Sequence, residues 1–467
     1  MKVLLLSPPY VPEYMRNARC DYVGLSISQW YPIWLAYCGA LLEKEGHQVR
    51  LIDAPAYRLD RKATVRAAEE FSPDLIVVYS STKSEKSDIE FATALKALAG
   101  ARLVFVGPFV SVWPEEILHQ GAACPASAVD FAVKGEFDYP VLELAEGREP
   151  EEIKNLFFRR DGEIKQNPLR PLLTTTELDS LPFVTDFYRR HLDLKKYKVP
   201  QELFPFVDLF TGRGCCYGRC TFCLWPHSFI PGAVYNKRSI DNVLDELEFV
   251  KKHIPQAREV FIQDDTLPTD RAQELSDSIL SRGLKIVWSC YARGNMDYQT
   301  LALMKRAGCR NLHIGYESAS NEVLKNIKKG VSRERMTRFT YDAQRAGLRV
   351  HGDFLVGLNG ETQESIKQTI RWARELNPHT AQFSILNIYP STPFYEYLSE
   401  HGFIQDGEPS YPHLTNEELR RWAKRGYAEF YLSWRYLKRI LREPGEHLFS
   451  QFRPISRMLS SIFWRRW

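Results

Sequence analysis

The chain has 467 residues, enough for two to four domains at roughly 100 to 200 residues per domain. Hydrophobic residues make up 44% and charged residues 26%, which excludes an intrinsically disordered chain and a membrane-embedded one. The nine cysteines are an odd number, and four of them fall between positions 215 and 223. This grouping excludes a disulfide framework and is typical of a metal site in a reducing compartment.

The amino-terminal apolar run, Val3 to Leu6, is too short for a signal peptide. The longest nearly apolar run, Trp30 to Leu42, contains Pro32 and falls short of the roughly 20 residues that a membrane span requires. We therefore expect a cytoplasmic protein without a spanning helix.

The first 150 residues alternate short apolar runs with helical periods, the helices being expected at Ile33–Glu45 and Ser87–Leu98. The expected strands are Val3–Ser7, Gln48–Ile52, Leu75–Tyr79, Leu103–Val106 and Phe131–Val133. This alternation predicts βαβ units and a doubly wound, Rossmann-like parallel sheet over residues 1–150. Such a sheet binds ligands at the carboxyl ends of its strands.

Residues 151–200 contain several prolines and are expected to form a connector. Six further apolar runs then follow, at Phe206–Phe210, Val260–Ile262, Ile286–Trp288, Leu312–Gly315, Phe354–Val356 and Gln382–Ile385. Six βα units are fewer than the eight that close a full barrel. The sequence therefore predicts an α/β protein with a partial (β/α)6 TIM-type barrel over residues 201–400.

The net charge of +4 is unevenly distributed along the chain. Residues 419–467 contain twelve Lys and Arg against three Asp and Glu, so this tail carries +9 and residues 1–418 carry −5. Apolar and aromatic side chains alternate with these cations, which predicts a helical, basic extension over residues 401–467. It could contact anionic lipid at the inner membrane face, or pack its apolar face on the body of the protein. We favour packing, because any docked helix is amphipathic.

A cysteine loop follows the first barrel strand, where Cys216, Cys220 and Cys223 have the spacing Cys-x3-Cys-x2-Cys. Three thiolates on a short loop can hold three irons of a [4Fe-4S] cluster and leave the fourth iron open. A zinc site would need four ligands in paired spacing, and neither Cys290 nor Cys309 has a partner close by in sequence. The preceding strand and Gly-Arg-Gly segment favour the cluster.

Phe222 stands directly before the last cysteine of this spacing. Together these features make residues 200–400 resemble the radical S-adenosylmethionine (SAM) superfamily. The resemblance implies that SAM chelates the open iron, and that one electron from the cluster cleaves SAM to methionine and a 5′-deoxyadenosyl radical. It implies Cys216, Cys220 and Cys223 as the cluster ligands. It implies SAM contacts at Phe222, Asp264, Asp265, Arg293, Glu317, Ser318 and Gly357.

The first cluster ligand is ambiguous. The family usually places it directly after Arg-Gly, where Cys215 stands, whereas the x3 spacing selects Cys216. Either the loop carries one extra residue or the two cysteines compete for the iron. Spacing favours Cys216, with Cys215 as a neighbouring thiol.

The amino-terminal domain resembles the cobalamin (B12)-binding domain that precedes the barrel in one class of radical SAM enzymes, through Tyr37–His47 and Val133–Glu136. The resemblance implies cobalamin contacts at Pro8, Asp53, Ser80, Ser81, Gly107, Pro108 and Glu136. The Asp-x-His-x-x-Gly motif is absent, so bound cobalamin would have no protein histidine on cobalt. The alternative is a degenerate domain that has lost cobalamin, because Gly107-Pro108 replaces the usual Gly-Gly.

A narrower resemblance links Trp30–Leu35, Leu181–Thr185, Cys220–Pro226 and Tyr389–Tyr395 to the hopanoid-biosynthesis-associated branch of radical SAM proteins. It implies a lipid-like substrate and makes Tyr389 and Thr392 candidate substrate contacts, although branch membership does not fix the substrate. Three histidines lie near strand ends or the cysteine loop, and the sequence selects none of them as a proton acceptor. They are His227, His313 and His351.

We therefore predict a cobalamin-dependent radical SAM enzyme that methylates carbon, or forms or rearranges a carbon bond, on a lipid-like or natural-product substrate. Its electron donor would be a flavodoxin or ferredoxin, and no nucleic-acid partner is expected. One alternative is remodelling of a hopanoid headgroup, a cyclitol ether, without methyl transfer. A tRNA methylthiotransferase-like enzyme is another, disfavoured because Cys20, Cys38 and Cys124 are misplaced for a second cluster. The sequence identifies no catalytic residue beyond the cluster ligands.

Overall fold

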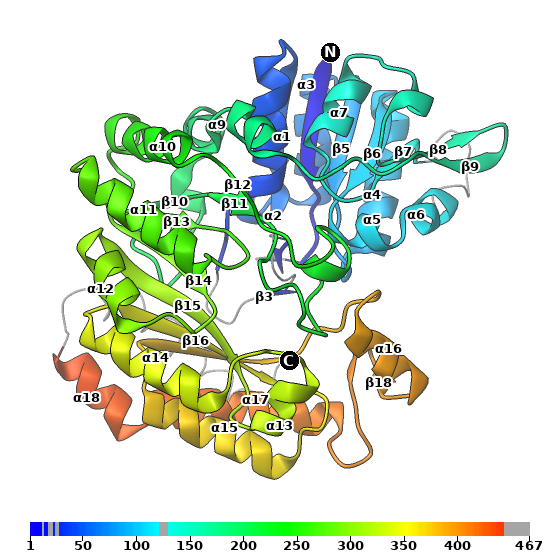
Figure 1. Cartoon of the computed structure of the whole chain (residues 1–467). Helices are drawn as coiled ribbons and strands as arrows, with labels where there is room; N and C mark the ends of the chain where they lie inside the picture. Colours follow the sequence, from blue (N-terminus) through cyan, green and yellow to red (C-terminus); the bar gives the residue numbers. More distant parts are fainter. Residues whose placement is uncertain (12–13, 17–21, 24–27, 121–128, 443–467) are drawn as a thin grey trace.

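The computed structural model describes residues 1–11, 14–16, 22–23, 28–120 and 129–442. An amino-terminal sheet, blue to cyan in Figure 1, lies beside a second sheet coloured green to orange, and helices cover both. The two sheets have seven and six strands. The α/β fold class predicted from the sequence is confirmed.

The amino-terminal sheet has the strand order β4-β1-β5-β6-β7-β8-β9. Its first five strands in this order pair in parallel, as the sequence predicts. Their bounds are β1 Lys2–Ser7, β4 Gln48–Asp53, β5 Leu75–Tyr79, β6 Arg102–Val106 and β7 Phe131–Val133.

Two antiparallel strands extend this sheet into the stretch that the sequence assigns to a connector. They are β8 Leu156–Arg160 and β9 Glu163–Gln166, joined through Asp161 and Gly162. Both turn residues have positive φ, of 53° and 83°, which is the conformation that Asp-Gly supplies in a two-residue hairpin. The Asp-Gly pair was the sequence signal for this hairpin.

Helices cover both faces of the amino-terminal sheet. Side chains of α1 Ile33–Lys44 and α7 Asp138–Ala145 pack on one face, and those of α4 Glu85–Ala99 pack on the other. Every residue of β5 is buried, with Val77 in the first of these cores and Val78 in the second. A parallel sheet buried on both faces needs such continuous apolar strands. The remaining helices here are α2 Ala54–Tyr57, α3 Arg61–Phe71, α5 Pro108–Val112 and α6 Pro114–Gln120.

The second sheet is an open barrel of six parallel strands in chain order. The strands are β10 Phe206–Leu209, β13 Glu259–Ile262, β14 Trp288–Ala292, β15 Cys309–Glu317, β16 Arg349–Val356 and β17 Thr380–Ile385. The third strand begins where the predicted run Ile286–Trp288 ends, because the buried but polar Ser289 interrupts the apolar pattern. The partial (β/α)6 barrel is confirmed.

Helices cover the outer face of the barrel in Figure 1. They are α10 Ile240–His253, α11 Thr269–Ser281, α12 Tyr298–Arg306, α13 Asn321–Asn326, α14 Arg333–Arg345 and α15 Gln363–Leu376. The elements that connect or flank the two sheets include α8 Thr175–Ser180, α9 Val184–His191, β11 Gly212–Arg213, β12 Asn236–Lys237, α16 Pro393–Glu400, β18 Ile404–Gln405 and β19 Glu408–Pro409. A short hairpin, β2 Tyr14–Met15 with β3 Tyr22–Val23, precedes α1.

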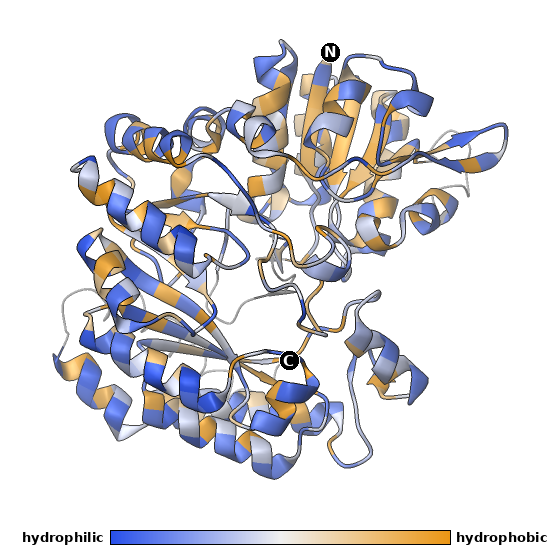
Figure 2. Cartoon of the chain, in the orientation of Figure 1, coloured by the Kyte–Doolittle hydropathy of each residue, from blue (hydrophilic) through white to orange (hydrophobic). Residues whose placement is uncertain are grey.

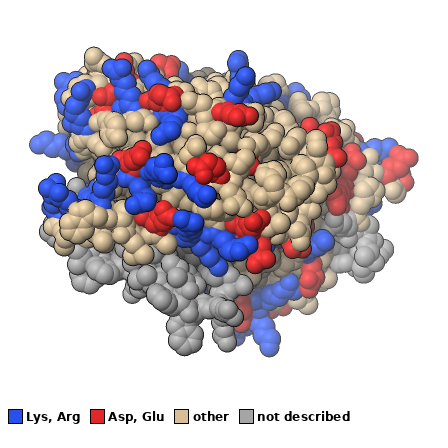
Figure 3. Space-filling model, turned by 90° about the horizontal axis from the view of Figure 1, so that it is seen from below, with Lys and Arg blue, Asp and Glu red and all other residues tan. Residues whose placement is uncertain are grey.

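The described part of the basic extension forms α17 Asn416–Tyr431 and α18 Trp434–Arg442. Leu419, Phe430 and Tyr436 are buried against the barrel, whereas Trp434 and Leu441 are exposed. Residues 443–467 lie outside the described part of the chain. Figure 3 shows basic and acidic side chains interspersed over the face of the molecule seen from below. Within the described residues, no helix has the length and apolar character to cross a bilayer. Membrane contact stays a prediction.

Candidate active site

A large cavity lies inside the barrel and at the carboxyl ends of its strands, with an open volume of about 1740 Å³. The cysteine loop lines one side of it, and residues of β14 to β17 line its wall and inner end. The inward-facing positions are polar: His313 and Glu317 on β15, and His351 and Asp353 on β16. Figure 2 shows the resulting mixture of hydrophilic and hydrophobic residues along the barrel strands.

The cysteine loop brings Cys215, Cys220 and Cys223 to the cavity, together with Phe222. Cys216 is exposed and does not line the cavity. Within the described residues, no three Cys, His, Asp or Glu side chains converge closely enough to hold a single metal ion. Three thiolates on one loop match the ligands of a [4Fe-4S] cluster, in which each thiolate binds a different iron, whereas a structural zinc site takes four ligands. The donor set therefore fits [4Fe-4S] better than zinc.

Arg213 anchors the start of this loop to the amino-terminal domain. Its guanidinium bonds Glu136 at 3.0 Å and Asp138 at 2.7 Å, and lies 4.6 Å from the ring centroid of Trp34. The side chain of Glu136 also accepts a hydrogen bond from the Leu173 N–H. Glu136, a predicted cobalamin contact, is thus engaged in holding the cysteine loop.

Charged side chains surround the cavity next to the thiols. Lys329 Nζ lies 2.7 Å from Glu317 Oε1, and Arg293 stacks 3.5 Å from the ring centroid of Tyr217 and donates to the Lys329 carbonyl at 2.7 Å. Burial by itself would lower the pKa of Lys329, but the Glu317 carboxylate outweighs it and raises that pKa. This arrangement suits the amino and carboxylate groups of SAM. The sequence predicts Arg293 and Glu317 but not Lys329, which no local motif marks.

The two aspartates after β13 have different places. Asp264 is buried and accepts hydrogen bonds from the Thr211 N–H at 2.7 Å and the Tyr235 hydroxyl at 2.7 Å, so it holds the backbone before the cysteine loop. Burial raises its pKa. Asp265 and Thr266 line the cavity, and Thr266 Oγ1 is buried without a hydrogen-bond partner among the described residues. An orphaned hydroxyl on the cavity wall is one that a bound ligand can satisfy.

Ser318 and Gly357, two further predicted SAM contacts, do not line the cavity. Ser318 is buried, with Thr369 Oγ1 3.4 Å from its hydroxyl. The Gly357 N–H donates to Glu361 Oε2 at 2.6 Å, and its φ of +90° needs glycine. Burial raises the pKa of Glu361 to about 8. These residues shape the ends of β15 and β16.

Two histidines form the inner end of the cavity. His313 Nε2 lies 2.6 Å from Glu202 Oε1, and His351 Nδ1 lies 2.7 Å from Thr380 Oγ1. Their ring centroids are 4.8 Å apart. Burial holds the pKa of His313 well below its usual value, so this imidazole is neutral at pH 7. The pair can bind the polar groups of a small molecule.

Of the remaining residues that the sequence singles out, one lines the cavity and the others stabilise the backbone around it. Tyr389 lines the cavity, whereas Thr392 is buried and caps α16 by accepting from the Tyr395 N–H at 3.2 Å. His227 Nε2 lies 3.0 Å from the Cys220 carbonyl oxygen and so braces the cysteine loop.

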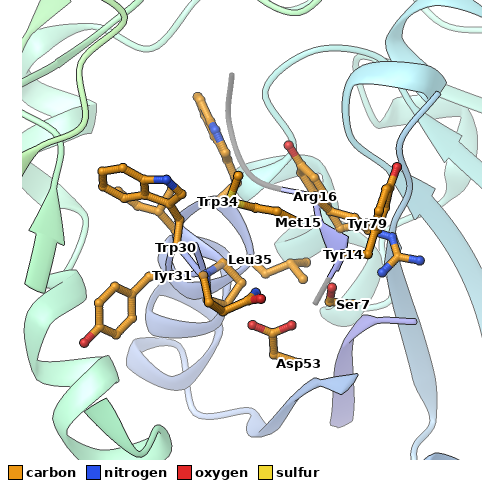
Figure 4. A pocket seen from close by; sticks show the side chains of 13 residues that line it. Ser7, Tyr14, Met15, Arg16, Trp30, Tyr31, Trp34, Leu35, Asp53 and Tyr79 are labelled. Atoms are coloured by element: carbon orange, nitrogen blue, oxygen red, sulfur yellow. The ribbon is translucent and has the colours of Figure 1, made fainter. Parts of the chain in front are cut away.

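A second, narrow cavity lies at the carboxyl edge of the amino-terminal sheet (Figure 4). Ser7 and Asp53, at the ends of β1 and β4, face Trp34 of α1 across it. The Tyr197 hydroxyl donates to Asp53 Oδ2 at 3.2 Å, and burial raises the pKa of Asp53 to about 6. No histidine is among the lining residues that the structure describes.

The other predicted cobalamin contacts bond to the protein itself. Ser80 donates to Asp88 at 3.1 Å, and Ser81 Oγ lies 2.8 Å from the Tyr14 hydroxyl oxygen. Arg16 forms a buried ion pair with Asp88 at 2.6 Å. The segment around β2 therefore closes this part of the sheet edge.

Pro8 and the Gly107-Pro108 turn complete the edge. The Pro8 carbonyl accepts from Arg16 at 2.5 Å. Gly107 has a φ of +111°, and a Cβ there would lie 2.8 Å from the Ser80 carbonyl oxygen, so only glycine fits. Pro108 begins α5. Of the seven predicted cobalamin residues, Asp53 is the one that lines the cavity.

The two cavities share a wall. Met15 and Trp30 line both of them, and Trp30 packs against barrel residues with its ring centroid 4.7 Å from that of Phe261. The sheet edge and the thiol-lined cavity are therefore neighbours at these two side chains.

Comparison with known proteins agrees with this geometry. Residues 210–373 match the radical SAM superfamily, and residues 19–145 match the B12 binding domain. The chain therefore carries a radical SAM domain and a B12-binding domain. The first match implies a [4Fe-4S] cluster and SAM, and the second implies cobalamin.

Relatives extend along most of the chain. An uncharacterized methyltransferase of Pyrococcus horikoshii is 29% identical over 92% of this chain and 93% of its own length. Cytidylyl-2-hydroxyethylphosphonate methyltransferase of Streptomyces wedmorensis is 26% identical over 88% of this chain and 84% of its own. The radical SAM methyltransferase TsrM of Kitasatospora setae shares the fold, with a TM-score of 0.67 and 21% identity over 86% of this chain and 76% of that one.

Proposed function

We propose that this radical SAM enzyme is a cobalamin-dependent C-methyltransferase whose substrate is a small molecule bound inside the barrel. The observation that carries the proposal is the shared wall of Met15 and Trp30, which sets the B12-binding edge beside the thiol-lined cavity. Relatives along nearly the whole chain that are named methyltransferases support it.

When bound, the reduced cluster and SAM supply a radical that removes a hydrogen atom from carbon, and cobalamin supplies the methyl group. The chain positions these reactants. Lys329, Glu317 and Arg293 lie where they can bind the charged amino-acid part of SAM. Trp30 and the aromatic side chains around it keep water away from the partition between the cavities.

The side chains around the edge cavity leave little free space inside it, whereas cobalamin is a large ligand. Bound cobalamin would therefore extend along the wall into the larger cavity, toward the thiols. With no histidine among the described residues that line the edge cavity, cobalt would have no histidine ligand from that wall.

The substrate would occupy the inner end of the large cavity. His313, His351 and Gln382 offer hydrogen bonds there, and Tyr291 and Phe354 offer apolar surface. This mixture suits a natural product with both ring or alkyl surface and polar groups. Remodelling of a hopanoid headgroup and a tRNA methylthiotransferase-like activity stay predictions, as do the flavodoxin or ferredoxin donor and the absence of a nucleic-acid partner.

The proposal is tested by the fate of SAM. Protein with a reconstituted cluster is incubated anaerobically with SAM, dithionite and hydroxocobalamin, and the nucleoside products are measured by mass spectrometry. Radical cleavage gives 5′-deoxyadenosine, whereas loss of the methyl group gives S-adenosylhomocysteine. We expect both products, with S-adenosylhomocysteine only when cobalamin is added.

Each other outcome has a distinct meaning. Formation of 5′-deoxyadenosine without S-adenosylhomocysteine would contradict methyl transfer and would indicate ring formation or rearrangement instead. S-adenosylhomocysteine that forms equally without cobalamin would contradict the role of the amino-terminal domain. A Cys220→Ser protein serves as the control, because it should give no 5′-deoxyadenosine above the background of dithionite alone.

A further inference from the structure

The two adjacent cysteines in the loop differ in exposure and in whether they line the cavity. Cys215 lines the cavity together with Cys220 and Cys223, whereas the neighbouring Cys216 is exposed and is not part of the cavity wall. Because the two residues are consecutive, they cannot both occupy the same place on that wall. The position of the loop therefore decides which thiol reaches a cluster.

The backbone before the pair is fixed. β11 pairs with β12, with Arg213 opposite Asn236, and the Arg213 guanidinium is buried in its ion pairs with Glu136 and Asp138. Gly214 follows with a φ of +92°, and a Cβ at this position would lie 2.4 Å from the Val234 carbonyl oxygen. Only glycine fits here.

The backbone after the pair is fixed as well. The Tyr217 hydroxyl donates to the Lys328 carbonyl at 2.7 Å. Gly218 has a φ of +57°, and a Cβ there would lie 2.4 Å from the Gly232 carbonyl oxygen. A shift of the loop by one residue would move Tyr217 or Arg219 into the place of Gly218, where neither side chain fits.

The sulfur of Cys215 already has a suitable neighbour. The Gly218 N–H donates to Cys215 Sγ at 3.5 Å. Backbone N–H groups that donate to cysteine sulfurs are among the features that tune iron–sulfur clusters. The turn that fixes Gly218 thus also directs a donor at the thiol on the cavity side.

We propose that Cys215 binds the cluster together with Cys220 and Cys223, which gives the spacing Cys-x4-Cys-x2-Cys, and that Cys216 is an outward thiol without iron. The inference rests on the cluster of the proposed function. It reverses the preference that the x3 spacing gives to Cys216. Each ligand thiol loses its proton to solvent as its sulfur–iron bond forms.

Three serine variants of the full chain test the assignment: Cys215→Ser, Cys216→Ser and Cys220→Ser. Each is reconstituted anaerobically with iron and sulfide, and then assayed for iron and for the EPR signal of the dithionite-reduced cluster with and without SAM. We expect Cys216→Ser to match the wild type at about four irons per chain. Cys215→Ser and Cys220→Ser should lose the reduced-cluster signal by more than about tenfold.

Alkylation of the wild type gives a second measurement that does not depend on the folding of a variant. The loaded protein is treated with iodoacetamide before and after iron removal, and the labelled cysteines are identified by peptide mass spectrometry. We expect Cys216 to be labelled in the loaded protein, and Cys215, Cys220 and Cys223 to be labelled only after the iron is removed.

Two results would overturn the inference alone: loss of the cluster in Cys216→Ser with retention in Cys215→Ser, or retention in both variants. Protection of Cys216 from alkylation in the loaded wild type would also contradict it. A wild type that takes up no cluster, or a Cys220→Ser protein that keeps a full one, would instead overturn the cluster of the proposed function, and the inference with it.

Discussion

The two parallel sheets use polar residues in opposite ways. β5 in the amino-terminal sheet is apolar and buried at every position, because helices cover both of its faces. β15 and β16 in the barrel alternate, with polar side chains such as His313, Glu317 and Asp353 on the inner face. Figure 2 shows the difference along the strands. A polar residue at every second position of a parallel strand therefore marks a barrel interior that receives a ligand.

The carboxyl edges of the two sheets also differ in whether their polar groups are available to a ligand. At the barrel edge, Glu317 and Lys329 form an ion pair on the cavity wall. At the amino-terminal edge, Arg16 and Asp88 form an ion pair that closes part of the edge. The barrel site is open to its ligands, whereas most polar groups of the amino-terminal edge already have protein partners.

The largest expected effect is the loss of reductive SAM cleavage when a cluster ligand at the barrel edge is removed. Cys220→Ser should reduce 5′-deoxyadenosine formation to the background of dithionite alone, because no other described residue on the cavity replaces a thiolate at that place. Chromatographic assay of 5′-deoxyadenosine, with the far-UV spectrum of the apoprotein as a folding control, measures it. Turnover above that background would show that the cluster does not use this thiol.

The next largest effect concerns stability and separates the two sheets. Phe105 in β6 is fully buried, so Phe105→Ala should cost about 3–5 kcal/mol in unfolding free energy. Ser384→Ala, at a cavity position of β17, should cost about 1 kcal/mol or less, because its hydroxyl is partly exposed and accepts a single hydrogen bond from Gln382. Urea titrations followed by circular dichroism compare them, and equal costs would contradict the contrast between a buried strand position and a cavity-lining one.

A pH effect is expected at the amino-terminal edge. Burial raises the pKa of Asp53 to about 6, above the roughly 3.9 of an unfolded chain. Its contribution to stability is therefore complete below pH 4 and is lost as the pH rises through 6, for a total of about 2–3 kcal/mol. Asp53→Asn keeps an oxygen that can accept from Tyr197 and removes the titration. Relative to the wild type, this variant should be more stable at pH 8 than at pH 4, and a pH-independent difference would exclude the titration.

The smallest effect is on SAM binding. Lys329→Met leaves the buried carboxylate of Glu317 without its cation, so SAM should bind about tenfold more weakly. Equilibrium dialysis with the loaded enzyme measures the dissociation constant, and Lys325→Met, at an exposed position of α13, is the matched control. Equal affinities of the two variants would exclude Lys329 from the SAM site.

The sequence predicted the fold well wherever burial alone determines the pattern. Four of the five parallel amino-terminal strands, β1, β5, β6 and β7, are apolar runs, whereas β4 is apolar mainly toward its buried end. It placed β14 too early along the chain because Ser289 interrupts the apolar pattern, and it missed β8 and β9 because the Asp161-Gly162 turn was not recognised. These errors are local, because the helices between the strands still fix the order of the barrel.

The candidate site was less predictable because it depends on contacts between distant segments. Spacing along the chain cannot show that Cys215 rather than Cys216 lines the cavity, since that follows from Gly214 and Gly218 packing against residues 232–234. Nor can it show that Glu136 bonds Arg213 in the other domain. Lys329 becomes visible only when α13 brings it next to β15.

The shared wall of Met15 and Trp30 is tested most directly by EPR of protein loaded with both metal centres. Samples are prepared with the reduced cluster alone, with cob(II)alamin alone, and with both together. Because the two cavities adjoin at this wall, we predict that the spectrum of the doubly loaded protein shows magnetic interaction between cobalt and the cluster, with each signal broadened. A spectrum equal to the sum of the two singly loaded samples would contradict a common site.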